Sequence, residues 1–164
     1  MQFHYRTDEV FHRSAGFVEL ARSAFEWLVV RGVERGRARA VAHVGVELLL
    51  DGYLARDVRV HRAYLGALES GAPGELGRHL SWGSPGGHLG FEDLRARLLS
   101  RGVTADEPTP EVTSQRLRRA LAGRPRLALD DPTELVTRDW VIVARPLVAA
   151  RAAPLAEEVA SGLR

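Results

Sequence analysis

Six ionisable side chains of this sequence fall into two sets that have the spacing of an α-helix. Within each set the neighbouring members are four residues apart, so on a helix they would lie one turn above another on the same face. Helical bundles hold metal ions with imidazole and carboxylate groups on facing helices. We call the sets the N-terminal stripe (His4, Asp8, His12) and the central stripe (His43, Glu47, Asp51). Two helices that turn these stripes towards each other would share a divalent cation.

The central stripe lies in a nearly continuous apolar segment, residues 40–54 (AVAHVGVELLLDGYL). The segment predicts a helix over residues 37–56 that is central and buried almost all round. A buried carboxylate is unfavourable unless it is paired or binds a metal. We therefore expect a compensating partner, which is a metal ion, a water-filled cleft, or arginines such as Arg22, Arg39 and Arg56. The sequence leaves these alternatives open.

Ligand chemistry narrows the choice of metal only in part. The chain has no cysteine, so thiolate metal sites and disulfides are excluded. Nitrogen and oxygen donors suit Mn²⁺, Mg²⁺, Fe or Zn²⁺ and do not distinguish between them. The remaining histidines, His61, His79 and His88, have no partner at ligand spacing, and we expect them on the surface or in loops.

Periodicity predicts the helices that carry these residues. Ser14 is expected to cap the N-terminus of one helix, Gly32 to end it, and Asp130 to open the C-terminal helix. Pro146 is expected to kink or break that last helix. Beside the N-terminal segment, we predict helices over residues 14–31, 37–56, 58–69, 91–100, 111–122 and 132–151, and residues 153–163 close the chain. The predicted fold class is all-α, a single-domain bundle of six or seven helices over residues 1–164.

Composition excludes several classes of protein. Hydrophobic residues make up 45% and charged residues 27% of the chain, which is typical of globular proteins. No apolar run approaches the ~18 residues of a membrane span, and the N-terminus is polar, so we expect no membrane association and a cytoplasmic location.

Charge gives weak evidence about partners. The net charge is +2, and the pI of about 9.6 reflects the use of Arg without Lys. We therefore do not expect nucleic-acid binding. Two clusters of arginines are expected to be solvated helix faces or a docking surface for an acidic partner: Arg35, Arg37, Arg39 and Arg116, Arg118, Arg119.

Several segments resemble the bacterial acyl carrier protein phosphodiesterases, a helical family related to HD-type metal phosphohydrolases. Residues 4–12 (HYRTDEVFH) resemble its motif His-Arg-x-Ile-Asp-x-x-Thr-Asp, with His4 and Asp8 in register. The final Asp of that motif is His12 in this chain. Shorter likenesses follow in the order of the family, at Arg-Pro-Arg-Leu (residues 124–127), Trp140 and Pro146.

A second motif of the family falls on the central stripe. Residues 49–57 (LLDGYLARD) are similar to its aromatic-Asp-His-Phe-Leu-x-Arg element, and match it at Asp51, Leu54 and Arg56. The His that follows this Asp in the family is Gly52 here.

The resemblance implies a fold, an activity and a site. The fold would be HD-domain-like, and the reaction would be hydrolysis of a phosphodiester such as the 4′-phosphopantetheine link of an acidic acyl carrier protein, with Mn²⁺ as the cofactor. Asp8 and Asp51 would be catalytic, while Arg6 and Arg56 would bind the phosphate. The metal ligands would come from both stripes: His4, Asp8, His12, His43, Glu47 and Asp51.

The family also carries an upstream helix with its own His and Asp. Either the ligand set of this chain is incomplete, or His12, His43 and Glu47 complete it, or the natural chain begins further upstream. The alternative function is a non-catalytic helical protein that kept the fold and uses Arg-rich faces to bind an acidic partner or to form a homo-oligomer.

Overall fold

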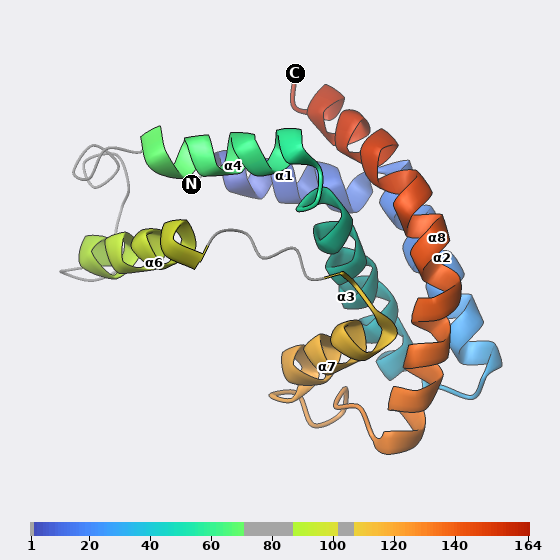
Figure 1. Cartoon of the computed structure of the whole chain (residues 1–164). Coiled ribbons are helices and arrows are strands. Elements are labelled where there is room, and N and C mark those ends of the chain that lie inside the picture. Colours follow the sequence, from blue (N-terminus) through green and yellow to red (C-terminus); the bar gives the residue numbers. More distant parts are fainter. Residues whose placement is uncertain (1, 71–86, 102–106) are drawn as a thin grey trace. The chain divides into compact units, whose positions relative to one another are not determined.

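The computed structural model describes residues 2–70, 87–101 and 107–164. Within these ranges the regular elements are seven α-helices and no strands, which confirms the predicted all-α class. They are α1 (Gln2–Arg13), α2 (Ala15–Val30), α3 (Arg35–Leu54), α4 (Val58–Ser70), α6 (Gly87–Arg101), α7 (Pro110–Leu121) and α8 (Asp131–Gly162) (Figure 1). The HD-domain-like arrangement of these helices stays a prediction.

Two compact units make up the chain. The larger comprises residues 2–53 and 106–164; it holds α1, α2, α7, α8 and α3 up to Tyr53, and we call it the five-helix unit. The smaller comprises residues 54–105 and holds α4 and α6. The single-domain organisation expected over residues 1–164 stays a prediction.

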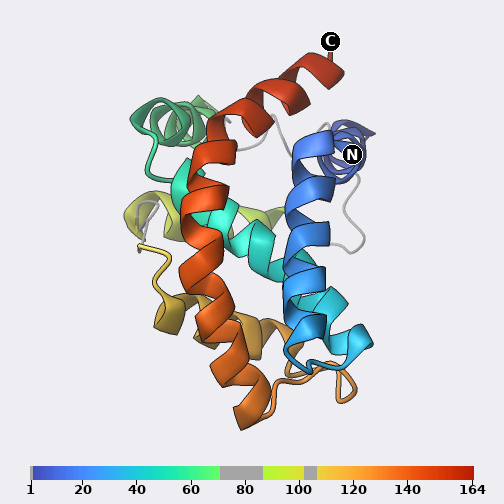
Figure 2. The same cartoon turned by 90° about the vertical axis from the view of Figure 1, so that its right-hand side faces the viewer.

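The five-helix unit is built around α3. Helices α2 and α8 run side by side, and α3 passes obliquely behind them (Figure 2). The core between the helices contains Leu28 of α2, Leu49 of α3, Leu117 of α7 and Val141 of α8, each with 0% of its surface exposed. Burial of one such side chain stabilises the fold by about 2 kcal/mol. The packing of this buried face therefore determines in which direction the opposite face of α3 points.

Local sequence sets the ends of these helices as predicted. The Ser14 hydroxyl accepts a hydrogen bond from the Phe17 amide at 3.4 Å and caps α2. Gly32 follows α2 with φ +84°, a left-handed conformation that suits glycine. Asp130 caps α8 by accepting a hydrogen bond from the Thr133 amide at 2.9 Å.

Helix α8 decides between the two effects expected of Pro146, a kink or a break. Its helical backbone runs without interruption from Asp131 to Gly162, through Pro146 and Pro154, so neither proline breaks it. The helix bends in its C-terminal part (Figures 1 and 2). Pro146 deprives the Ile142 carbonyl of its i+4 donor. Ile142 is 61% exposed, so water can take that hydrogen bond on this side of α8.

The smaller unit pairs α4 with α6. Arg95 of α6 donates from Nε to the Leu68 carbonyl at 2.6 Å and from Nη2 to the Glu69 carbonyl at 3.4 Å. These carbonyls belong to the last turn of α4 and have no partner within that helix. Helix α6 begins at Gly87 and not at the predicted residue 91. Within the described ranges, no helix has both the length and the apolar character that crossing a bilayer requires.

Candidate metal centre

The structure brings together one residue of the N-terminal stripe and two of the central stripe. His12 Nε2 of α1 lies 2.8 Å from Glu47 Oε1 of α3, and His43 Nε2 lies 3.3 Å from the same oxygen. The three ligand atoms lie within 4.8 Å of one another. We call these residues the His–His–Glu cluster. One turn of α1 and two turns of α3 therefore bring two imidazole nitrogens and a carboxylate close together.

Phe17 holds both imidazole rings in place. It is 3% exposed and lies at the start of α2, directly after the Ser14 cap. The rings of His12 and His43 meet its edge at centroid distances of 5.1 and 5.2 Å, both nearly perpendicular. The two imidazoles are in turn stacked on each other, 4.8 Å apart with an interplanar angle of 5°. The sequence analysis gave Phe17 no role at the site, because helical spacing does not show which rings it meets.

Hydrogen bonds fix which nitrogen of His12 faces the cluster. Its Nδ1 lies 2.9 Å from the backbone carbonyl of Asp8, which can only accept, so Nδ1 carries a proton and donates. Its Nε2 then faces Glu47. Desolvation lowers the pKa of His12, but the hydrogen bonds to Glu47 and to the Asp8 carbonyl outweigh it and raise the pKa above the ordinary 6.5. A cation at this point would take the place of the Nε2 proton.

The cluster lies at the surface, which corrects the expectation of a buried central stripe. The side chains of His43 and Glu47 are 46% and 31% exposed, and Asp51 is exposed as well. The apolar residues of α3 turn towards α2, α7 and α8, so the stripe follows the opposite, solvent side of the helix. Access from solvent is what a substrate would need.

Asp51 lies one turn beyond Glu47, outside the three-residue cluster. Desolvation raises the pKa of the Asp51 carboxyl, and the negative charge of Glu47 raises it further, while Arg116 of α7 opposes both. Because Asp51 is an exposed residue, solvent screens part of this effect. Arg116 was expected on a solvated helix face, and its electrostatic contact with Asp51 was missed.

The other predicted site residues are not part of the cluster, or their side chains are not among the described residues. The Asp8 carboxylate is 58% exposed and lies 3.4 Å from Nδ1 of His12, on the side of the ring that faces away from Glu47. The side chain of His4 falls outside the described residues. Arg6 lines a separate pocket with Glu158 of α8, and Arg56 belongs to the smaller unit.

The central stripe has other partners than the arginines named from the sequence: His12 at Glu47 and Arg116 at Asp51. Glu47 accepts from His12 of the facing helix, and not from Arg22, Arg39 or Arg56. The guanidinium of Arg39 lies instead over the ring of Phe25, at 5.9 Å.

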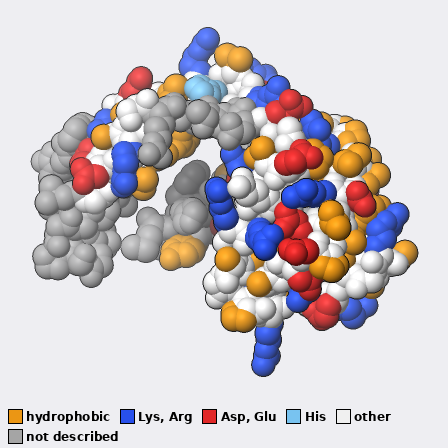
Figure 3. Space-filling model, turned by 60° about the horizontal axis from the view of Figure 1, so that its bottom comes forward, with side chains coloured by type: hydrophobic (Ala, Val, Ile, Leu, Met, Phe, Trp, Pro, Cys, Tyr) orange, Lys and Arg blue, Asp and Glu red, His pale blue; other side chains and the backbone are white. Residues whose placement is uncertain are grey.

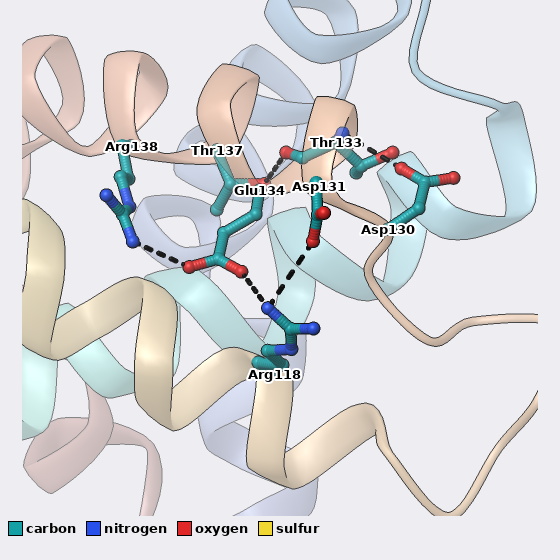
Figure 4. A network of polar contacts seen from close by, with 7 residues as sticks. All are labelled: Arg118, Asp130, Asp131, Thr133, Glu134, Thr137 and Arg138. Atoms are coloured by element: carbon teal, nitrogen blue, oxygen red, sulfur yellow. Dashed lines mark hydrogen bonds and ion pairs between the residues drawn. The ribbon is translucent and has the colours of Figure 1, made fainter.

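A second polar network ties α7 to α8 away from this site (Figure 4). Glu134 is 9% exposed and accepts from Arg118 at 2.6 Å and from Arg138 at 2.8 Å. The bond from Arg138 is the main reason that the pKa of Glu134 is lowered, and Arg118 adds to it. Arg118, expected on a solvated face, is thus part of the fold.

Acidic and basic side chains alternate over the face of the five-helix unit that Figure 3 shows. This view displays no continuous basic surface of the kind that nucleic acids favour.

Comparison of the chain with protein-family models, curated proteins and solved structures finds no match. The likeness to acyl carrier protein phosphodiesterases therefore rests on the sequence motifs.

Proposed function

We propose that this protein is a metal-dependent hydrolase that cleaves phosphodiesters at the His–His–Glu cluster. The observation that carries the proposal is the convergence of His12, His43 and Glu47 from α1 and α3 within 4.8 Å, on the solvent side of the unit. Three side-chain ligands that leave a position open are typical of catalytic metal sites, whereas structural sites are closed by four.

The residues around the cluster suit this role. A divalent cation supplies Lewis-acid chemistry, in that it polarises a phosphoryl oxygen and lowers the pKa of water. His12 holds its Nε2 towards Glu47 because the Asp8 carbonyl fixes its tautomer, and Phe17 packs against the rings of both His12 and His43. These contacts preorganise His12, whereas one of the two stacked rings has to turn before a cation can bind both nitrogens.

Asp51 is the residue best suited to move a proton. Its pKa is raised by desolvation and by Glu47, which brings a carboxylate closer to the range where it accepts a proton from water near neutral pH. Arg116 acts on the same carboxyl, so it adds positive charge close to Asp51. Asp51 thus keeps the catalytic role expected from the sequence, as a base and not as a metal ligand.

The substrate class follows from the sequence resemblance. The motifs that contain Asp8 and Asp51 resemble those of enzymes that release 4′-phosphopantetheine from an acyl carrier protein. We therefore propose a phosphodiester of this kind, with an acidic carrier protein as the partner.

The experiment is metal analysis of the purified full chain together with hydrolysis of bis(p-nitrophenyl) phosphate. The proposal expects a divalent metal to bind and the hydrolysis to depend on it. Glu47→Gln removes the charged ligand and should abolish both. Glu26→Gln, at an exposed position of α2 away from the cluster, is the matched control and should change neither.

One observation favours the non-catalytic alternative. His12 and Glu47 are joined directly, so the cluster can be satisfied by its own hydrogen bonds. That alternative expects a metal-free protein whose melting temperature does not change when a chelator is added. Metal binding with hydrolysis that Glu47→Gln abolishes would contradict it.

A further inference from the structure

We propose that the His–His–Glu cluster is a four-coordinate site for a Zn²⁺-class ion with one open position, and not an oxygen-rich site for Mn²⁺ or Mg²⁺. The inference rests on the proposed function only in taking this cluster as the metal centre. It departs from the Mn²⁺ that the sequence resemblance implies, because it follows the donor atoms that the fold brings together.

The donor set consists of two imidazole nitrogens and a single carboxylate. Imidazole suits Zn²⁺, Cu²⁺, Ni²⁺ and Fe²⁺, whereas Mg²⁺ and Mn²⁺ favour carboxylate, carbonyl and water oxygens. Two histidines and one glutamate with an open fourth position is also a recurrent ligand set of catalytic zinc.

The carboxylates that would make the site oxygen-rich are turned elsewhere. Asp8 approaches Nδ1 of His12 at 3.4 Å, while Nε2 of the same ring faces Glu47 at 2.8 Å. These two nitrogens lie on different sides of the imidazole, so one cation cannot bind Nε2 and the Asp8 carboxylate together. Asp51 lies a turn of α3 beyond Glu47 and outside the group of atoms within 4.8 Å.

Two of the three distances between donors are near those of a small tetrahedral ion, and the two imidazole nitrogens lie within 4.8 Å of each other. Bonds of about 2.0–2.1 Å at tetrahedral angles place neighbouring donors roughly 3.3 Å apart. His43 Nε2 lies 3.3 Å from Glu47 Oε1, and His12 Nε2 lies 2.8 Å from it in a direct hydrogen bond. To admit the ion, the His12–Glu47 hydrogen bond has to open, and one of the two stacked imidazoles has to turn until both nitrogens point at the ion. His43, whose side chain is 46% exposed, is the ring that can turn.

Charge and access favour an open position that takes an anion. A dication bound by Glu47 and two neutral imidazoles leaves the site with a net positive charge. The His43 side chain is 46% exposed, so the ion would remain open to solvent on that side. Water or a phosphate oxygen would complete the coordination.

The test uses the full chain with Co²⁺ as a spectroscopic probe of the metal site. Four-coordinate Co²⁺ absorbs visible light strongly, and six-coordinate Co²⁺ absorbs weakly. We expect about one equivalent of Co²⁺ with strong absorption, displaced by equimolar Zn²⁺ but not by Mn²⁺ at roughly a hundredfold excess. A weak, six-coordinate spectrum, or displacement by Mn²⁺, would overturn the inference.

A substitution makes the test independent of the general preference of proteins for Zn²⁺ over Mn²⁺. His43→Glu exchanges a nitrogen donor for an oxygen donor at an exposed position and should lower the ratio of Zn²⁺ to Mn²⁺ affinity by about tenfold or more. His61→Glu makes the same change on α4 and should leave the ratio unaltered. An unchanged ratio in His43→Glu would contradict the proposed donor set.

The outcomes separate this inference from the proposed function. A Zn²⁺-class ion bound by a protein that hydrolyses no phosphodiester supports the inference and overturns the function. Hydrolysis that depends on six-coordinate Mn²⁺ supports the function and overturns the inference. A chain that binds none of these ions overturns both.

Discussion

Gly45 of α3 faces the indole ring of Trp140 in α8, and a β-carbon at residue 45 would lie 2.6 Å from the ring atom Cζ3. Trp140 is 2% exposed, so its ring has no room to move. The close approach of α3 to α8 therefore requires a residue without a side chain at this point, two residues before Glu47 of the cluster.

Gly45→Ala tests this contact. Overpacking of a core typically destabilises by about 1–3 kcal/mol, which exceeds the gain of about 1 kcal/mol in helix propensity. Chemical denaturation should show a lower free energy of unfolding. Gly66→Ala on α4 is the control, because nothing lies within 4 Å of a β-carbon there, and it should be neutral or stabilising. Equal effects of the two substitutions would contradict the packing argument.

Glu158 of α8 caps α2 from outside the helix. Its carboxylate accepts from the Ala15 amide at 2.6 Å and from the Gly16 amide at 3.3 Å. These amides have no partner within α2, and the negative charge also suits the positive end of the helix dipole. Glu158→Ala should lower the free energy of unfolding by about 1 kcal/mol in urea denaturation. Glu157→Ala, at the exposed neighbouring position, should have little effect.

Three helix ends with a clear capping residue were predictable from the sequence, whereas the start of α6 and the end of α8 were not. Ser14, Gly32 and Asp130 act within one or two turns of their own position, so local chemistry decides them. The exposure of His43 was not predictable, because nearly every neighbour on α3 is apolar and only tertiary packing decides which face is covered. Phe17 escaped notice for the same reason, since helical spacing gives its face but not the rings that meet it.

The candidate site was predictable in its ligand types but not in its membership. The spacing of four residues assigned His12 to the N-terminal stripe and Glu47 to the central stripe. In the structure these two stripes meet at one end only. Where two helices cross, a stripe of three residues meets its partner at one level and diverges at the next. The point at which the helices cross depends on side chains throughout the core, so it cannot be predicted from the residues of the two stripes alone.

Asp130 makes the stability of the five-helix unit depend on pH. Hydrogen bonds from Thr133 and the contact with Arg37 lower the pKa of Asp130 from 3.8 to about 2. The carboxylate therefore stabilises the fold fully above pH 3.8, and this contribution is lost as pH falls through the folded pKa of about 2. Urea denaturation at pH 7 and at pH 2–4 measures it. In Asp130→Asn the stability should fall less steeply over this acid range.

Glu134 joins α7 to α8 through two arginines. Glu134→Ala leaves Arg118 and Arg138 without their shared carboxylate, and we expect a loss of about 2 kcal/mol, less than for a fully buried pair because both arginines are partly exposed. Glu111→Ala, an exposed residue at the start of α7, is the comparison. If the two variants unfold at the same urea concentration, the network does not hold these helices together.

Asp51 and Glu47 allow binding of the metal to be separated from proton transfer. If Asp51 accepts the proton, Asp51→Asn should lower kcat by about 10²–10⁴-fold while the metal stays bound, because loss of a general base removes a contribution of that size. Glu47→Gln should lose metal and activity together, since it removes the carboxylate that His12 and His43 share. Metal analysis and steady-state hydrolysis of the two variants, compared with Glu26→Gln, make this distinction. An Asp51→Asn protein that keeps full activity would remove Asp51 from the mechanism, and one that loses its metal would make Asp51 a ligand.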